Sequence, residues 1–246
     1  MPARAFEREH AAPDHPRYAE YYGSDRLARW RELCARDKAA NIMALWRETR
    51  NGASCTVADI GCGDGAVIQE LSRHGFGRSY VGFEISRSGL EYAQTRQYEK
   101  SAAFVMFDGA NVPTPDKSFD VVLLTHVLEH VESPRTLLRE AARIARYVIA
   151  EVPLELHART SQDFRSNDIG HTNLFNPLLL RHLFQSLGLT VLDEQITCPS
   201  RAIFTFHRPV PAATMDWAAK AALLKIVPTL APRLWTYHGS LIAVSE

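Results

Sequence analysis

Residues 57–65, with the sequence VADIGCGDG, constrain the fold more than any other part of this chain. A short apolar strand runs there into a glycine turn, and two later strand-like segments end at Glu84 and just before Asp108. The ends of parallel strands converge on one crevice in an open sheet, so we expect Asp59, Glu84 and Asp108 to line a single ligand site. Three acidic groups around a glycine floor suit a ligand with hydroxyls, an amino group and positive charge. They suit a polyphosphate poorly.

Strand-like and helical patterns alternate from residue 55 onward, which is typical of a parallel α/β sheet. A long amphipathic helix over 25–50 precedes them. Three signals predict where helices begin. They are a capping box at residues 88–91, the pair Ser133-Pro134, and the pair Asn176-Pro177, where Phe175 and Leu180 can form a hydrophobic staple. The expected strands are 55–60, 80–84, 103–107, 119–124, 147–152 and 189–196. The expected helices between and after them are 66–74, 88–98, 134–146 and a last one that begins at residue 177 and ends at Gly188. Near the C-terminus, residues 202–206 and 241–244 both have the pattern of short strands.

The ordered motifs resemble those of the class I, Rossmann-like S-adenosylmethionine (AdoMet)-dependent methyltransferases. Asp59-x-Gly61-x-Gly63-x-Gly65 resembles the first motif, Asp108-Gly109 the adenine-binding corner, and residues 116–122 the lead into the fourth strand. The resemblance covers roughly residues 56–196. It implies that AdoMet is bound and S-adenosylhomocysteine released. The cofactor residues it implies are Asp59, Gly61, Cys62, Gly63, Gly65, Glu84, Ile85, Asp108, Gly109, Thr125 and His126.

The same resemblance assigns roles and an architecture. Asp59 is expected to orient the amino-acid end of AdoMet, Glu84 to chelate the ribose diol, and Asp108 to accept from the adenine amino group. For each carboxylate the alternative is helix capping or turn formation. The implied fold is a doubly wound, mostly parallel seven-stranded sheet with an antiparallel last strand, for which we favour 241–244. Residues 1–52 would form an N-terminal helical lid, and 53–246 the methyltransferase domain with an insertion at about 199–238.

Two other interpretations remain open at this point. Gly61-x-Gly63-x-x-Ala66 also fits a dinucleotide-binding pattern, with Glu84 at the expected distance for NAD. Against it, Asp59 and Asp64 would repel a pyrophosphate, Asp108 has no role in that pattern, and little chain remains for a substrate domain. A non-catalytic AdoMet-binding partner subunit is the other alternative.

The segment His126-Val127-Leu128-Glu129-His130 follows the fourth strand. It matches the inverted zinc-peptidase motif, but Pro134 follows too soon for the stable helix that such a motif needs. Residues 128–131 resemble those of quinone-type O-methyltransferases, some of which use a divalent ion, and Glu129 and His130 are candidate ligands for one. Alternatively His126 or His130 is a general base. The remaining alternative is that these residues buttress the loop and cap the next helix.

A long polar segment after the fifth strand supplies further candidates, because such loops carry specificity in open sheets. We rank His171 beside His126 and His130 as the three expected catalytic residues. The tyrosines before the long N-terminal helix either pack under the lid or close over a ligand. The further acceptor-side candidates are Glu151, Glu155, His157, Arg159, Arg165, Asp168 and Asn173, and the tyrosines are Tyr18, Tyr21 and Tyr22.

The composition of the chain argues against several classes of protein. The formal net charge is +0, so nothing in the charge balance points to nucleic acid. The four cysteines form no C-x-x-C pair, which indicates neither a disulfide framework nor a cysteine zinc site. Residues 1–15 lack the apolar core of a secretion signal, and no apolar run approaches the roughly 20 residues that span a bilayer. We therefore expect a cytoplasmic monomer or homodimer that methylates an oxygen or nitrogen of a small molecule. The expected acceptor is a metabolite, a secondary-metabolite intermediate or a sugar, and a metal ion is not expected to be required.

Overall fold

The structure, a computed structural model, describes residues 21–50, 52–160, 170–206 and 208–245. Tyr18, Arg165 and Asp168 lie outside these ranges. Within them, strands form one sheet in the order β3-β2-β1-β4-β5-β7-β6. The strands are β1 Cys55–Ile60, β2 Gly77–Glu84, β3 Ser101–Met106, β4 Phe119–Thr125, β5 Ala145–Pro153, β6 Thr190–Thr197 and β7 His238–Val244.

The sheet has the predicted mixed topology. Strands β1 to β5 pair in parallel, whereas β7 lies between β5 and β6 and is antiparallel to both. The order reverses beside β1, and this switch point places the carboxyl ends of β1, β2 and β4 around one crevice. The expected Rossmann-like fold, with its antiparallel last strand, is confirmed.

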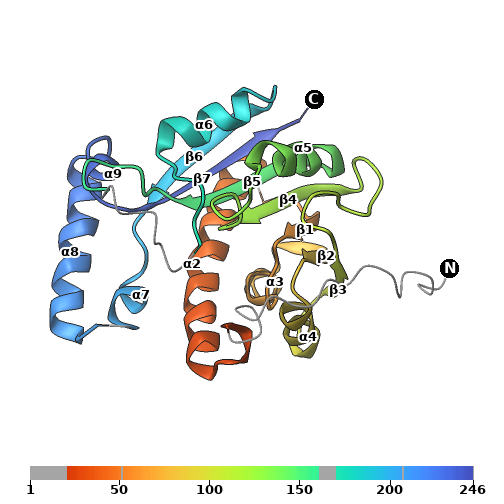
Figure 1. Cartoon of the computed structure of the whole chain (residues 1–246), viewed down its shortest axis with the longest axis horizontal. Helices are drawn as coiled ribbons and strands as arrows, with labels where there is room; N and C mark the ends of the chain where they lie inside the picture. The colour runs from red at the N-terminus through yellow and green to blue at the C-terminus, as the bar shows by residue number, and fades with distance from the viewer. Residues whose placement is uncertain (1–20, 51, 161–169, 207, 246) are drawn as a thin grey trace.

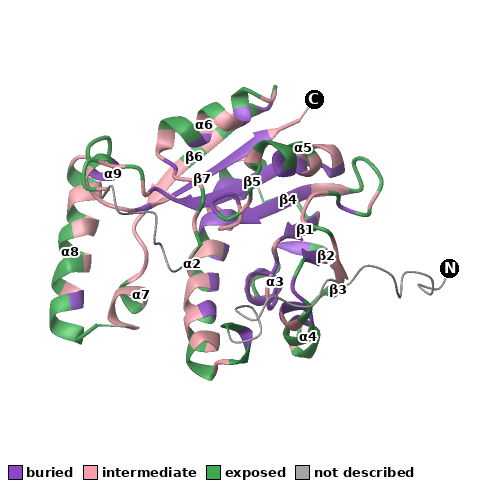
Figure 2. Cartoon of the chain, in the orientation of Figure 1, coloured by how far each residue is buried: buried purple, intermediate pink, exposed green. Residues whose placement is uncertain are grey.

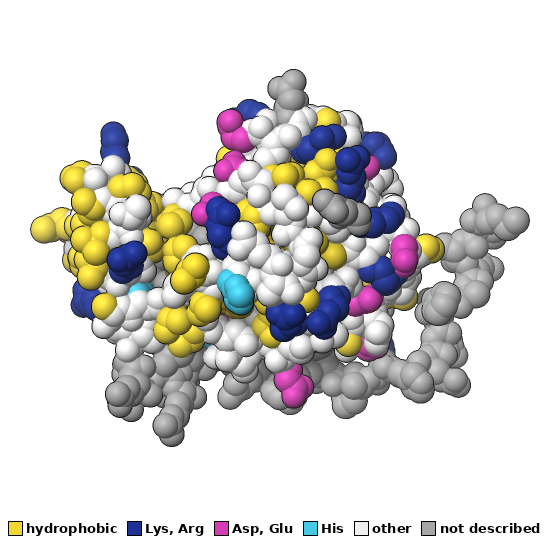
Figure 3. All heavy atoms as spheres, turned by 90° about the horizontal axis from the view of Figure 1, so that it is seen from above, with side chains coloured by type: hydrophobic (Ala, Val, Ile, Leu, Met, Phe, Trp, Pro, Cys, Tyr) yellow, Lys and Arg dark blue, Asp and Glu magenta, His cyan; other side chains and the backbone are white. Residues whose placement is uncertain are grey.

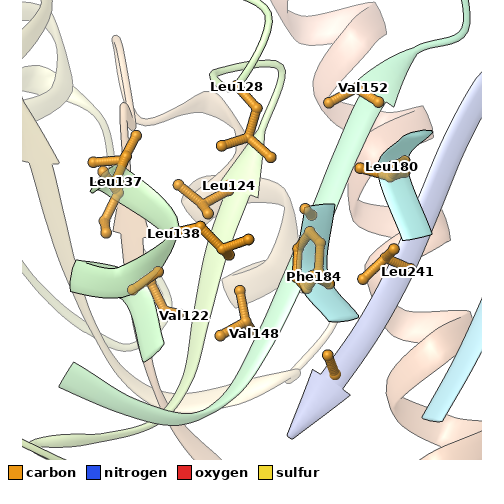
Figure 4. Packing of buried hydrophobic residues seen from close by; sticks show 14 of the residues in the cluster. Val122, Leu124, Leu128, Leu137, Leu138, Val148, Val152, Leu180, Phe184 and Leu241 are labelled. Atoms are coloured by element: carbon orange, nitrogen blue, oxygen red, sulfur yellow. The ribbon is translucent and has the colours of Figure 1, made fainter. Parts of the chain in front are cut away.

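Helices cover both faces of the sheet (Figure 1). One core cluster joins α5 and α6 to β4, β5 and β7, and Figure 4 shows Leu138 and Phe184 pointing onto the strands. The other joins α2 and α3 to the opposite face, where Ile42 and Leu45 are buried. Figure 2 shows the central strands buried while α8 is largely exposed. The helices are α2 Asp25–Arg50, α3 Ala66–Arg73, α4 Arg87–Thr95, α5 Pro134–Ile144, α6 Pro177–Gln185, α7 Arg201–Phe206, α8 Val210–Ile226 and α9 Ala231–Leu234.

Two local predictions are wrong. The α4 cap is Ser86, whose Oγ accepts from the Gly89 N–H at 3.1 Å, so the cap lies two residues before the predicted one at Ser88. Residues 202–206 form helix α7 instead of a strand, with Phe206 packed against Trp30 at 5.3 Å between ring centroids. Short apolar runs do not distinguish strand from buried helix by pattern alone, and packing against α2 decides the outcome here.

Apolar side chains gather on the α8 end of the molecule (Figure 3). The exposed members there include Val210, Met215 and Ile226. Among the described helices, none combines the length and apolar character needed to cross a bilayer. All four cysteines are free thiols.

Candidate functional site

The glycine turn after β1 has a backbone that only glycine adopts readily. Gly61, Gly63 and Gly65 have φ values of 74°, 55° and 73°. A Cβ on Gly61 would lie 2.6 Å from the Cγ2 of Val127, so the turn packs closely against the segment that follows β4. Cys62 is buried within the turn, and its Sγ points toward Gly82 of β2. The turn therefore presents backbone, without protruding side chains, to the crevice.

Glu84 ties the end of β2 to this turn. One carboxylate oxygen accepts from the Gly63 N–H at 2.8 Å, and the other accepts from the N–H groups of Ile85 and Ser86, each at 2.9 Å. Tyr22, just before α2, lies beside them, its hydroxyl 3.0 Å from where a Cβ on Gly63 would stand. Burial, and then Glu84, raises the pKa of Tyr22. Tyr22 thus covers the turn, while Ile85 is 47% exposed.

Asp59 is 1% exposed, and neither of its carboxylate oxygens has a hydrogen-bond partner among the described residues. Burial raises its pKa to about 7, against the opposing effect of Lys38. A buried carboxylate without donors is costly unless something binds it. Two oxygens of this kind behind a glycine turn fit a cationic or hydroxyl-bearing ligand, as the sequence predicts.

Asp108 forms a turn after β3. Its Oδ1 accepts from the N–H groups of Ala110 and Asn111 at 2.8 and 2.6 Å, and its Oδ2 from the Asn111 side chain at 2.8 Å. The Asn111 side chain and these backbone groups lower the pKa of Asp108. The carboxylate therefore shapes the turn at Gly109, whose φ is 85°, and it remains exposed.

Asp64 differs from its sequence interpretation. It is 4% exposed and bound by the Nε of Arg31 at 2.7 Å and by the Nη2 of Arg96 at 2.6 Å. Its charge is neutralised within the protein and anchors α2 to the glycine turn. The expected repulsion of a pyrophosphate by Asp64 is wrong, and that argument now depends on Asp59 alone.

Residues 126–130 form a turn after β4 instead of a helix, so the peptidase geometry is not present in them. His126, at φ 59°, follows the buried Thr125, whose carbonyl accepts from the Lys38 Nζ at 3.4 Å. The His126 ring lies between two carboxylates, with Nδ1 3.2 Å from Glu129 Oε1 and Nε2 3.3 Å from Glu151 Oε1. Burial and Lys38 lower the pKa of His126, but Glu129 and Glu151 outweigh them and raise it overall.

Glu151, on β5, is fully buried and connects distant parts of the chain. Its Oε2 accepts from Asn41 Nδ2 at 2.7 Å and from Ser240 Oγ at 2.9 Å, and its Oε1 lies 3.4 Å from His238 Nδ1. Burial would raise the pKa of Glu151, but the two imidazoles hold it well below its ordinary value. Sequence reasoning found Glu151 and missed these three partners, because they lie in α2 and β7.

His130 and His171 form a second group. Their ring centroids are 4.7 Å apart, and His171 Nδ1 lies 2.7 Å from Glu155 Oε2. His130 Nδ1 lies 3.3 Å from the carbonyl oxygen of Gly170, which can only accept, so that nitrogen carries the hydrogen and Nε2 keeps its lone pair. Burial lowers the pKa of His130. With Glu129, these histidines place ligand atoms within 4.8 Å of one another, so the predicted ligand pair Glu129 and His130 does lie together.

The segment that carries His171 is held against the turn after β4. Asn173 donates to the carbonyl of Leu128 at 3.1 Å and to that of Val131 at 2.6 Å. His157 and Arg159 lie apart from this cluster, where His157 contacts Thr236 and Arg159 packs over Trp235. The structure thus brings His126, His130 and His171 to one edge of the sheet, next to the glycine turn through Val127.

Comparison with known proteins assigns the fold and site to a family. A family model described as a methyltransferase domain matches residues 20–194. A solved structure of magnesium protoporphyrin IX methyltransferase from Synechocystis PCC 6803, with bound S-adenosylhomocysteine, has a similar fold, with a TM-score of 0.57 at 18% identity over 93% of this chain and 98% of that one.

Curated relatives agree with this match. An uncharacterized methyltransferase of Mycolicibacterium gilvum is 31% identical over 144 residues, which is 58% of this chain and 50% of that protein. A mitochondrial ubiquinone biosynthesis O-methyltransferase of Candida albicans is 30% identical over 101 residues, or 39% of this chain and 31% of its own length. The chain spans about half the length, or less, of these relatives. The family match nevertheless covers most of the chain, and the chain belongs to the class I S-adenosylmethionine-dependent methyltransferases.

Proposed function

We propose that this protein transfers a methyl group from AdoMet to an oxygen or nitrogen of a small-molecule acceptor. The observation that carries the proposal is the pair His130 and His171 at the same sheet edge as the glycine turn and Asp59. Bound AdoMet supplies an electrophilic methyl carbon on a sulfonium. The protein's task is then to align the acceptor and to remove its proton.

The residues on the cofactor side fit AdoMet. The unpartnered carboxylate of Asp59 suits its ammonium group, and the glycine turn admits close approach of backbone N–H groups. Glu84 lies against that turn, and Asp108 stands exposed at the next strand end. In this proposal Tyr22 covers the cofactor as part of an N-terminal lid.

On the acceptor side, His130 and His171 are suited to accept a proton. Each has its Nδ1 directed at an oxygen of the protein, which leaves Nε2 for a substrate hydroxyl or amine. His126 has both ring nitrogens directed at carboxylates, so we assign it a positioning role. The name of the Candida albicans relative favours an oxygen acceptor.

The test supplies labelled AdoMet with a panel of phenols, hydroxy acids, sugars and amines, and measures S-adenosylhomocysteine and labelled product. We expect turnover on at least one hydroxyl compound, and Asp59→Asn should reduce both binding and turnover. AdoMet binding without turnover on any acceptor, alone or with added cell extract, would instead support a non-catalytic partner subunit.

A further inference from the structure

Buried, unpartnered polar atoms concentrate at one place in the molecule. Within the described part of the chain, His126 Nε2, Glu151 Oε1 and His238 Nδ1 have no hydrogen bond of acceptable geometry, and neither do the two carboxylate oxygens of Glu129. Glu151 and Glu129 are each 0% exposed. Unpaired polar atoms are rare in protein interiors, so their presence together calls for an occupant.

We propose that His126, Glu151 and His238 bind a divalent transition-metal ion. The three atoms lie within 4.8 Å of one another, with Nε2–Oε1 and Nδ1–Oε1 separations of 3.3 and 3.4 Å. Ligands at about 2.0–2.2 Å from a zinc-like ion stand roughly 3.0–3.5 Å apart in tetrahedral or octahedral geometry. Two imidazoles and a carboxylate, with coordination positions left open, are a common set for such ions.

The surroundings of the three residues resemble an outer coordination shell. His126 directs its other ring nitrogen at Glu129, and the second oxygen of Glu151 accepts from Asn41 and Ser240. Metal-binding histidines and carboxylates have outer partners of this kind, which fix their orientation. Each of these partners comes from a different part of the fold, and the six residues converge near the ends of β4 and β5.

A dication at this cluster would meet two buried carboxyl groups, Glu151 as a ligand and Glu129 beside His126. An ion of charge +2 at the three atoms would neutralise both carboxylates and would leave His126 free to donate from Nδ1 to Glu129.

An ion here would have a use in the proposed reaction, a step that rests on the proposed function. Its open positions would face water or the oxygen of the acceptor, whose pKa it would lower. This site differs from the Glu129, His130 and His171 group, which shares none of its three ligands.

The experiment uses the full chain, treated with chelator and then titrated with Co²⁺ in the absence of AdoMet and acceptor. We expect about one ion per chain and visible absorption bands typical of nitrogen and oxygen ligands. His238→Gln should weaken Co²⁺ binding at least tenfold. His157→Gln, a matched change outside the cluster, should leave it unchanged, and Co²⁺ should raise the thermal midpoint of wild type but not of His238→Gln.

Two results would overturn the proposal. One is no stoichiometric binding of Co²⁺, Zn²⁺ or Mn²⁺ to the wild-type chain, which would indicate a protonated network in place of a metal centre. The other is loss of binding in His171→Gln with retention in His238→Gln, which would place the ion at the other group. The His238 side chain is 15% exposed, so its replacement should fold even where Glu151→Gln does not. None of these measurements depends on methyl transfer, so they test the metal site independently of the proposed function.

Discussion

The proposed cofactor side and the proposed acceptor side of the crevice are assembled in different ways. On the cofactor side, Glu84 and Asp108 bond mainly to backbone N–H groups within a few residues or on the neighbouring turn. On the acceptor side, Glu151 bonds to side chains 89 and 110 residues away in the sequence. The first side depends on local backbone conformation, and the second depends on the complete tertiary fold.

The two sides also differ in electrostatic balance. Burial raises the pKa of Asp59, to which none of the described residues donates a hydrogen bond, whereas Glu151 is buried among imidazoles that lower its pKa. The cofactor side therefore keeps an uncompensated acceptor for a ligand. The acceptor side already holds groups that compensate each other in part. Variants on each side should separate binding of AdoMet from turnover.

The largest expected effect is on turnover. His130→Ala and His171→Ala should each lower kcat roughly 10²–10⁴-fold, the usual contribution of a positioned acid or base. AdoMet affinity by calorimetry should change less than threefold, and the exposed His74→Ala should match wild type in both measurements. Turnover at wild-type level in both variants would reduce the pair to a structural role.

The next effect falls on cofactor binding. Glu84→Ala removes the acceptor of three backbone N–H groups, one in the glycine turn and two directly after β2. We expect AdoMet affinity to fall roughly 100-fold and the free energy of unfolding to fall by about 2–4 kcal/mol. Glu84→Gln keeps one accepting oxygen and should lose less. Unchanged affinity in Glu84→Ala would break the assignment of the cofactor side.

Sequence reasoning succeeded where the signal is local. The glycine turn and the carboxylates at the strand ends follow from short-range patterns, and the predicted bounds of β1 are the observed ones, whereas the antiparallel last strand is implied by the family resemblance. The antiparallel last strand was expected at residues 241–244, and it begins earlier, at His238. Because of that difference the sequence did not indicate that Ser240 and His238 lie on the last strand, where they pair with Glu151 and Pro153.

Other residues had no local signal at all. In the sequence, Asn41 and Lys38 are ordinary polar positions of a long helix. Only the packing of α2 on the sheet brings Asn41 to Glu151 and Lys38 to Thr125. Asp64 misled for the same reason, since its partners Arg31 and Arg96 lie 33 and 32 residues away. Composition and spacing identify a charge, but the fold decides what that charge meets.

A smaller effect, on the free energy of unfolding, is expected from a substitution in α2, the helix that contacts both sides. Arg31→Met removes one of two arginines from Asp64 and frees two carbonyls at residues 21 and 22. Because Arg96 still pairs with Asp64, we expect a loss of about 2 kcal/mol in unfolding free energy. Urea unfolding measures it, with the exposed Arg181→Met as a control near zero. A loss no greater than that control would show that α2 is held by its apolar face alone.

The smallest effect should appear in the pH dependence of AdoMet affinity. The folded pKa of Asp59 is raised to about 7 from 3.8, so in the ligand-free protein this carboxyl is increasingly protonated below pH 7. A bound ammonium group favours the ionised form, so binding should release a proton, and affinity should fall by up to tenfold per pH unit below 7 and level off above it.

The raised pKa of Asp59 also affects how the unfolding free energy depends on pH. This second measurement distinguishes the burial of Asp59 from its role in AdoMet binding. An acid whose pKa is raised on folding contributes stability at low pH and loses it as the pH rises through the folded pKa. Between pH 4 and 7 the unfolding free energy of wild type should therefore decline relative to Asp59→Asn, by up to about 1.4 kcal/mol per pH unit. Calorimetry in buffers of different ionisation enthalpy counts the released proton. If Asp59→Asn shows the same slopes as wild type in both measurements, the buried charge on the cofactor side is not Asp59, and the contrast with the compensated acceptor side fails.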